Sequence, residues 1–307
     1  MKALLVIPAA VLALSLGFVA ASCGAGDGAE SAGPVPSVEE TEDATTEEIP
    51  PATTEEEGTD TEPEPTGTVT YQVWFQTADG LFVTYRTEPS TPRVGTAALE
   101  ALLAGPNAVE EGNGLSTSVP EGTQLLGLTI EDGIASVDLT SEYESGGGTL
   151  SMQMRLAQVV FTLTQFPTVD GVTFSLDGEP IDVLGGEGII IDHPLTRRDY
   201  ADLLPAILVT APTFGQEIST PLRVRGSANV FEANVTVRLL DEDGDEIAST
   251  FTTATCGSGC RGTYRVSLPF GIDGPQEAVV VVQDDDADGD GRPSHEVRIP
   301  VLLVPSA

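Results

Sequence analysis

The sequence predicts an α+β region over residues 68–193, followed by an all-β antiparallel sandwich over residues 206–307. In the first region, candidate hairpins alternate with two segments of helical period, whereas the second has short β-rich runs and no helical period. The segment before these two regions, residues 24–67, has a different composition: it holds fourteen Asp or Glu and no Lys or Arg. Such a segment buries too little apolar surface to offset chain entropy, so residues 23–67 are expected to form a disordered acidic linker.

Residues 1–22 predict a lipoprotein signal peptide. Lys2 precedes an uncharged apolar run, and small residues stand directly before Cys23. This junction resembles the bacterial lipobox, in which the cysteine thiol receives a diacylglyceryl group. The alternatives are an ordinary signal peptide with an incidental cysteine, or an uncleaved anchor. We expect a chain lipid-anchored at Cys23 on the extracytoplasmic face of the bacterial cell membrane, with the acidic linker as its tether.

In the α+β region, the spacing of apolar residues and the positions of turn residues indicate the strands and helices. Apolar alternation predicts strands, spacing of three and four predicts helices, and Asp132-Gly133, Gly105-Pro106 and Pro167 mark turns or stops. The predicted order is strands 69–76 and 81–86, helix 95–104, strands 125–131 and 134–139, helix 150–166, and strand 172–176. This order predicts two helices packed on one antiparallel sheet.

The C-terminal region follows a linker at residues 194–205. Seven short runs rich in β-branched and aromatic residues are separated by Gly, Asp and Pro turns within about 100 residues, which is typical of an antiparallel sandwich. The predicted strands are residues 207–209, 222–224, 235–240, 247–252, 263–268, 278–283 and 296–303.

Four ordered motifs of the first region resemble the GerMN domain of sporulation and germination lipoproteins. They are ALEALLAGP at 98–106, VPEGT at 119–123, DGIASVDL at 132–139 and QVVFTLTQFP at 158–167. Three motifs of the second region resemble the immunoglobulin-like domain of bacterial spore germination proteins: PLRVRG at 221–226, VFEANV at 230–235 and YRVSLPF at 264–270. The resemblance implies a non-catalytic envelope protein, and it supplies no catalytic residues.

Composition excludes some classes of function. The 48 Asp or Glu against 13 Lys or Arg give a net charge of −35, which argues against nucleic-acid binding because that needs a basic surface. The chain has only two histidines, His193 and His295, and none of the common catalytic or nucleotide-binding motifs. We therefore expect no enzyme and no catalytic residues.

Cys256 and Cys260 flank Gly-Ser-Gly and predict a disulfide in an exported protein. Two thiolates would need two further ligands to hold zinc, and the sequence nearby offers none. The three-residue spacing also excludes a C-x-x-C redox motif.

Residues 284–291 suggest a calcium loop. Asp284, Asp286 and Asp288 alternate before a glycine in the pattern D-x-D-x-D-G, and Glu296 stands one place late for the bidentate ligand of an EF-hand. The alternative is a solvated turn in an Asp-rich chain. Calcium is the only cofactor that the sequence suggests, and both interpretations stay open.

These observations predict a non-catalytic envelope lipoprotein that binds other envelope proteins or peptidoglycan, with the resemblance implying a link to sporulation or germination. Two alternatives are a wall-remodelling hydrolase with carboxylates in an interdomain cleft, and a calcium-dependent adhesive module.

Overall fold

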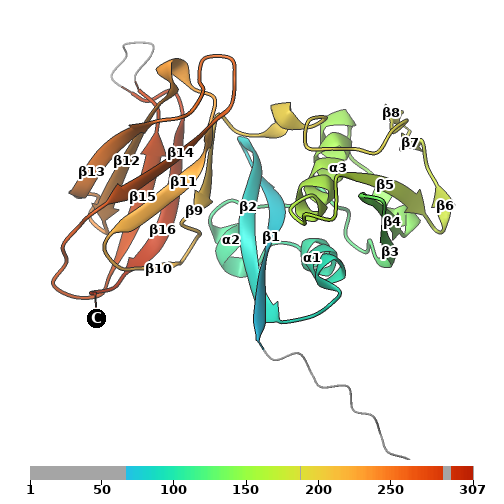
Figure 1. Cartoon of the computed structure of the whole chain (residues 1–307), viewed down its shortest axis with the longest axis horizontal. Coiled ribbons are helices and arrows are strands. Elements are labelled where there is room, and N and C mark those ends of the chain that lie inside the picture. The colour runs from blue at the N-terminus through green and yellow to red at the C-terminus, as the bar shows by residue number, and fades with distance from the viewer. Residues whose placement is uncertain (1–66, 187, 286–291, 307) are drawn as a thin grey trace, which may run out of the picture. The chain divides into compact units, whose positions relative to one another are not determined.

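The computed structural model describes residues 67–186, 188–285 and 292–306 (Figure 1). The expected signal peptide, the lipidation residue Cys23 and nearly all of the acidic linker lie outside the described residues. The first region contains β1 (Thr68–Thr77), β2 (Gly80–Pro89), α1 (Val94–Leu103), α2 (Ala108–Gly112), β3 (Leu125–Glu131), β4 (Ile134–Leu139), the 3-10 turn Ser141–Glu144, α3 (Thr149–Leu163), β5 (Gly171–Leu176), β6 (Glu179–Pro180), β7 (Val183–Leu184) and β8 (Ile189–Ile190).

The hairpin β1–β2 comes first among the described elements. The two strands pair antiparallel in unbroken register, with Phe75 opposite Phe82 and Thr77 opposite Gly80. Gly80 has φ +131° and lies so close to the carbonyl of Leu203 that a Cβ would come within 2.3 Å of its oxygen. Only glycine fits this turn without displacing backbone.

Helices α1 and α3 lie between this hairpin and the four-stranded sheet β3-β4-β5-β6 (Figure 1). Because α3 is covered on both sides, Met152 and every residue of the segment 154–163 are buried. The apolar residue Leu150 is an exception on this helix: it lies in the first turn of α3, before the packed segment, and is 64% exposed.

The prediction of a single antiparallel sheet with two helices is wrong in detail. Strands β4 and β5 pair in parallel, with Val137 opposite Phe174, because α3 returns the chain to the same end of the sheet before β5 begins. The hairpin β1–β2 forms a separate sheet, and the described residues include a third α-helix, the short α2. The region is nonetheless mixed helix and sheet, as expected.

The C-terminal region is a β-sandwich. Its elements are the 3-10 turn Ala201–Leu203, β9 (Ile207–Ala211), β10 (Glu217–Ile218), β11 (Leu222–Ala228), the turn Phe231–Ala233, β12 (Asn234–Asp241), β13 (Glu246–Thr253), β14 (Gly262–Leu268), β15 (Gln276–Gln283) and β16 (Glu296–Leu303). One sheet has the order β10-β16-β15-β12-β13 and the other the order β14-β11-β9. Alternate side chains of both sheets, such as Val237 and Val224, fill the space between them.

One short strand of the sandwich departs from the predicted pattern. The sequence predicts seven antiparallel strands, but an eighth strand of two residues, β10, pairs in parallel with β16 through Ile218 and Leu303. Two residues are too few to produce a readable alternation, so only the fold reveals this strand.

Candidate functional site

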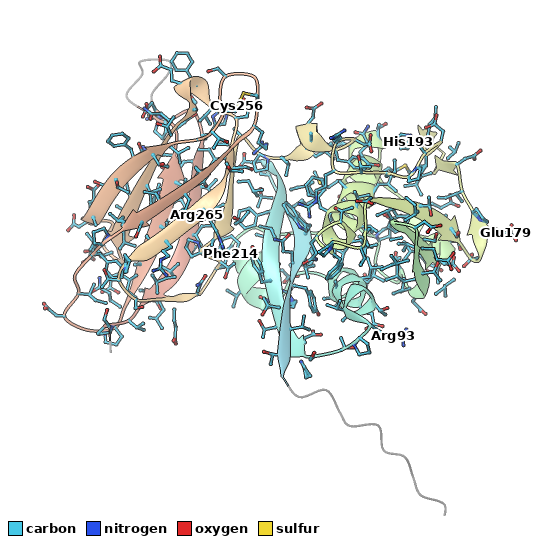
Figure 2. All side chains as sticks on the ribbon, in the orientation of Figure 1. Arg93, Glu179, His193, Phe214, Cys256 and Arg265 are labelled. Carbon is cyan, nitrogen blue, oxygen red and sulfur yellow. A yellow bond between two sulfur atoms is a disulfide. The ribbon has the colours of Figure 1, made fainter. Side chains whose placement is uncertain are left out.

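The two C-terminal cysteines form a disulfide between β13 and β14 (Figure 2). The Cα atoms of Cys256 and Cys260 are 5.7 Å apart. Between them, Gly257 packs so tightly on Ala233 that a Cβ would lie 2.6 Å from its atoms, and the N–H of Ser258 donates to the carbonyl of Val230 at 2.9 Å. The bridge therefore fastens a tightly packed loop.

Asp284 and Glu296, the two described residues of the suggested calcium site, bond to different partners. The Asp284 carboxylate is 4% exposed and accepts hydrogen bonds from the backbone N–H of His295 at 2.8 Å and from its Nδ1 at 2.7 Å. Glu296 forms an ion pair with Arg298 at 2.9 Å. Asp286 and Asp288 lie outside the described residues, and the described part of the chain gathers no three His, Cys, Asp or Glu side chains that could hold a metal ion. Calcium binding stays a prediction.

His193 lies in an exposed cluster of carboxylates (Figure 2). Its Nδ1 is 2.7 Å from Asp192 and its Nε2 is 3.4 Å from Asp199. Hydrogen bonds to Asp192 and then to Asp199 raise the pKa of His193, because both carboxylates stabilise the charged imidazolium.

A cavity of about 1060 Å³ is a candidate binding surface in the chain's described part. We call it the α3 groove. Its walls come from the β1–β2 turn, a connecting segment after α2, the glycine-rich loop before α3, the first turns of α3, and the 3-10 turn Ala201–Leu203. The lining residues are 76–80, 117–120, 145–151, Met154, Arg155, Asp202 and Leu203.

The glycine-rich loop of the α3 groove is held by a buried arginine. The guanidinium of Arg155, 2% exposed, donates to the carbonyls of Tyr143, Ser145 at 3.1 Å and Gly146 at 3.0 Å. Burial lowers the pKa of Arg155. Gly147, with φ +78°, leaves no room for a Cβ beside Ser151, so the loop keeps one shape.

The opposite wall of the groove is held by polar side chains of α3 that bond to the free edge of β1. Gln158 Nε2 donates to the carbonyl of Trp74 at 3.1 Å, and its Oε1 accepts from the N–H of Ser118 at 2.9 Å. Thr162 Oγ1 accepts from the Trp74 N–H at 3.2 Å, and Gln165 Nε2 donates to the Gln72 carbonyl at 2.7 Å. These side chains, spaced by four and three residues, satisfy an edge that would otherwise offer unpaired backbone groups.

The lining of the groove is mixed in chemistry. Its polar groups are hydroxyls, amides, backbone groups, the guanidinium of Arg155 and the carboxylates of Asp79 and Asp202, and its rim carries the exposed side chain of Leu150. Neither histidine of the chain and neither disulfide cysteine lines it. A mixed polar and apolar lining on a rigid frame can orient a peptide or a glycan.

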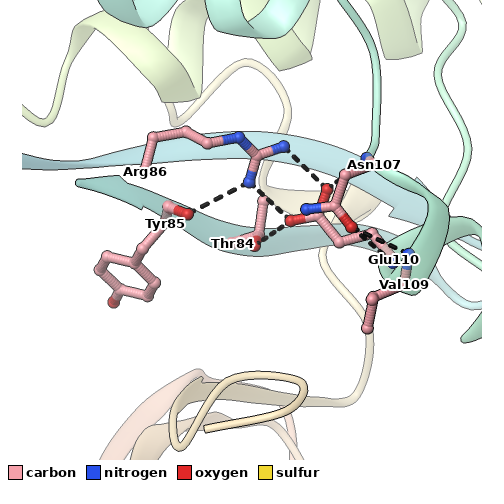
Figure 3. Close-up of polar contacts among 6 residues, drawn as sticks. All are labelled: Thr84, Tyr85, Arg86, Asn107, Val109 and Glu110. Carbon is pink, nitrogen blue, oxygen red and sulfur yellow. Dashed lines mark hydrogen bonds and ion pairs between the residues drawn. The ribbon is translucent and has the colours of Figure 1, made fainter. Parts of the chain in front are cut away.

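A largely buried ion pair joins α2 to β2 (Figure 3). Arg86 donates through both terminal nitrogens to Glu110, at 2.6 and 2.8 Å, and Glu110 also accepts from Thr84 and from the Asn107 N–H. Burial favours a raised pKa for Glu110, but the hydrogen bonds from Arg86, Thr84 and Asn107 outweigh it and leave that pKa below its ordinary value.

Sequence reasoning did not find the residues that build the groove. Gln158 and Thr162 stand within the helical period as ordinary positions, and nothing in the sequence indicates that they face a strand edge. Arg197, which belongs to a rare basic pair with Arg198 in the linker, is expected from the sequence to form a local ion pair, but among the described residues it instead stacks on Phe161 at 4.8 Å and on Trp74 at 5.3 Å. Among the helices of residues 67–306 that the structure describes, none has the length and apolar character required to span a membrane.

Comparisons with known families assign both regions. Residues 59–182 match the Germane family, described as sporulation and spore germination, and residues 206–290 match Gmad2, the immunoglobulin-like domain of bacterial spore germination. The chain is therefore similar to two germination-associated domains, matched in this order along the sequence. A search of curated proteins found no match.

Three solved structures are similar to part of the chain. The first GerMN domain of the sporulation protein GerM from Bacillus subtilis is 26% identical, with 43% of this chain and 99% of that chain covered and a TM-score of 0.37. The tandem GerMN domains of the same protein are 17% identical, with 78% and 62% covered and a TM-score of 0.40. A putative lipoprotein from Clostridium perfringens is 24% identical, with 45% and 93% covered and a TM-score of 0.33.

Proposed function

We propose that this protein, whose chain carries a Germane domain followed by a Gmad2 domain, is a non-catalytic lipoprotein of the cell envelope that works by binding. The observation that carries the proposal is the pairing of two germination-associated domains in one chain. A role in sporulation or germination is the simplest use of that pairing.

The α3 groove is the binding surface in this proposal. Its loop and its strand edge are both fixed by buried hydrogen bonds, through Arg155 on one side and Gln158 on the other. A preorganised surface of this kind loses little entropy when a partner binds. The partner is an envelope protein, and peptidoglycan is the competing ligand to be tested.

The membrane attachment in this proposal is a lipid on Cys23. The small residues before Cys23 and the acidic run of residues 24–67 support it, because like charges extend such a tether and keep the binding domains away from the bilayer. Metabolic labelling with palmitate tests it: the full chain should be labelled and membrane-bound, and Cys23→Ser should lose both properties. An unlabelled wild-type chain recovered from cytosol would reject the anchor.

Site-specific photocrosslinking tests the groove. A photoreactive residue at Leu150, 64% exposed on the groove rim, should capture one discrete envelope protein in intact cells. The matched control is the same residue at Val109, 58% exposed on α2 and outside the groove, which should not capture that protein. Equal capture at both positions would reject the groove as the binding surface.

Peptidoglycan provides two further controls. Co-sedimentation of the full chain with purified peptidoglycan, competed by the captured protein, distinguishes the two ligands. Release of soluble fragments from peptidoglycan by the purified chain would overturn the non-catalytic proposal in favour of a wall-remodelling hydrolase.

A further inference from the structure

Three arginines share the outer face of the three-stranded sheet β14-β11-β9. Arg223 and Arg225 lie on β11, and Arg265 lies on β14, where Figure 2 labels it. All three side chains are exposed. Arg225 and Arg265 are directly opposite each other in the antiparallel register, so their side chains stand on the same face. We call this set the arginine face.

The strands that carry the arginine face supply no carboxylate to neutralise it. The strands β9, β11 and β14 contain no Asp or Glu, although the chain has 48 acidic residues against 13 basic ones. Within the described residues, none of the three guanidiniums forms an ion pair, whereas Arg86, Arg238 and Arg298 each do. Like charges directly opposite in a sheet destabilise it. Because the three arginines lie close together without an internal ion-pair partner, this surface is suited to bind an anion from outside the protein.

A cavity of about 600 Å³ opens beside these arginines. All three arginines line it, together with Gln216, Glu217 and Ser219 from the segment around β10. The wall thus combines three cations with an amide, a hydroxyl and one carboxylate. The carboxylate repels a second carboxylate but accepts hydrogen bonds from hydroxyl groups.

We propose that the arginine face is a binding site for a linear polyol phosphate polymer, a chain in which phosphodiesters alternate with hydroxyl-bearing units. Arg225 and Arg265 have Cβ atoms about 5 Å apart, so they converge on one phosphate. Arg223, two residues along β11, is displaced by about 7 Å and meets the next phosphate. Gln216, Glu217 and Ser219 bond the hydroxyl groups between phosphates.

Two other anionic partners fit the surface less well. A planar anionic membrane faces the whole of an acid-rich protein and is repelled by it, whereas a narrow chain meets only the basic strip within a Debye length of about 8 Å. An acidic peptide of Asp and Glu lacks the regularly spaced hydroxyl groups that Gln216, Glu217 and Ser219 would bond. This inference rests on the proposed function in one respect: the protein would meet a polyol phosphate polymer only at the proposed envelope location. The binding chemistry of the arginine face does not depend on that location.

Binding of the full-length chain to immobilised poly(glycerol phosphate) tests the site, measured by interferometry from 50 to 500 mM NaCl. The variant Arg225→Gln/Arg265→Gln should bind about 25-fold more weakly at low salt, since each arginine facing a phosphate contributes about fivefold. Its plot of log affinity against log salt should be shallower by about 1.5. The matched control Arg238→Gln/Arg298→Gln removes the same charge from β12 and β16 of the other sheet and should bind like the wild type.

The outcomes separate the site from its competitors. Thermal unfolding should show Arg225→Gln/Arg265→Gln at least as stable as the wild type, because two like charges have been removed. No binding by the wild type, equal loss in both double variants, or stronger binding to polyglutamate or to phosphatidylglycerol vesicles would overturn the proposal. Failure of palmitate labelling would instead reject the envelope location and leave this binding measurement unchanged.

Discussion

Replacing Gln158 by leucine removes a buried connection between α3 and the edge of β1. The side chain of Gln158 is 0% exposed and bonds to the Trp74 carbonyl at 3.1 Å and to the Ser118 N–H at 2.9 Å. Leucine has similar size and helix propensity, so the change leaves the helix intact. What it removes is the partner of two buried backbone groups.

The expected cost follows from those two groups. A buried donor or acceptor left unpaired costs about 1–3 kcal/mol, so the carbonyl of Trp74 and the N–H of Ser118 together cost about 4 kcal/mol. Burying the leucine side chain offsets this by about 2 kcal/mol. Gln158→Leu should therefore lower the free energy of unfolding of this region by about 2 kcal/mol, which moves its urea midpoint down by about 1 M.

The assay is urea unfolding followed by tryptophan fluorescence. Trp74 is the only tryptophan of the chain and is 2% exposed next to the altered position, so its emission reports on this region alone. The control is Gln153→Leu, the same chemical change on α3 at a half-buried residue whose side chain makes no hydrogen bond among the described residues. That control should stay within about 0.5 kcal/mol of the wild type.

A shift in midpoint no larger for Gln158→Leu than for Gln153→Leu would refute the reasoning. It would mean that the edge of β1 does not depend on α3 for its hydrogen bonds, and that the groove wall is held by apolar packing alone.

Two further predictions use the same chain. Because the pKa of Glu110 is lowered in the folded state, the ionised carboxylate stabilises the fold fully above the ordinary carboxyl pKa, and this stabilisation is lost as pH falls through the lowered value. The free energy of unfolding, measured between pH 7 and 3, should therefore decrease less in Glu110→Gln than in the wild type. At pH 7 that variant should be about 3 kcal/mol less stable than the wild type, because Arg86 loses its charged partner. A wild-type unfolding free energy that does not change between pH 7 and 3 would contradict the predicted pH dependence. Replacing Cys256 and Cys260 together by serine should cost about 2 kcal/mol by loop entropy relative to the disulfide-bonded wild type, measured by calorimetry. Reduced wild type should melt like the variant, and unchanged melting of the sandwich in the variant would contradict the prediction.

Local pattern accounted for most elements. The alternation along β1 and β2, the period of α3, and Asp132-Gly133 with positive φ at both residues are short-range properties, and the structure has them where the sequence predicts them. The two domain resemblances likewise rest on contiguous motifs, and the family matches confirm them. What failed was the direction of β5 beside β4, because pairing direction depends on where a crossover helix returns the chain.

The candidate sites were less predictable than the fold. The calcium pattern and the cysteine pair are short motifs, so they can be read directly, whereas the α3 groove joins segments up to 127 positions apart, from Gln76 to Leu203. Arg155 and Gln158 look like ordinary polar residues of a helix until the fold buries them against carbonyls and a strand edge. Their roles arise from burial, which sequence composition does not give.

By itself the sequence determined the acidic tract and the class of each folded region, because each depends on neighbours within a few residues. Only the tertiary structure decided that Arg265 stands opposite Arg225, that neither forms an ion pair among the described residues, and that α3 closes the edge of β1. Register and burial bring together residues that are distant along the chain, and the free energy of those contacts depends on the completed fold.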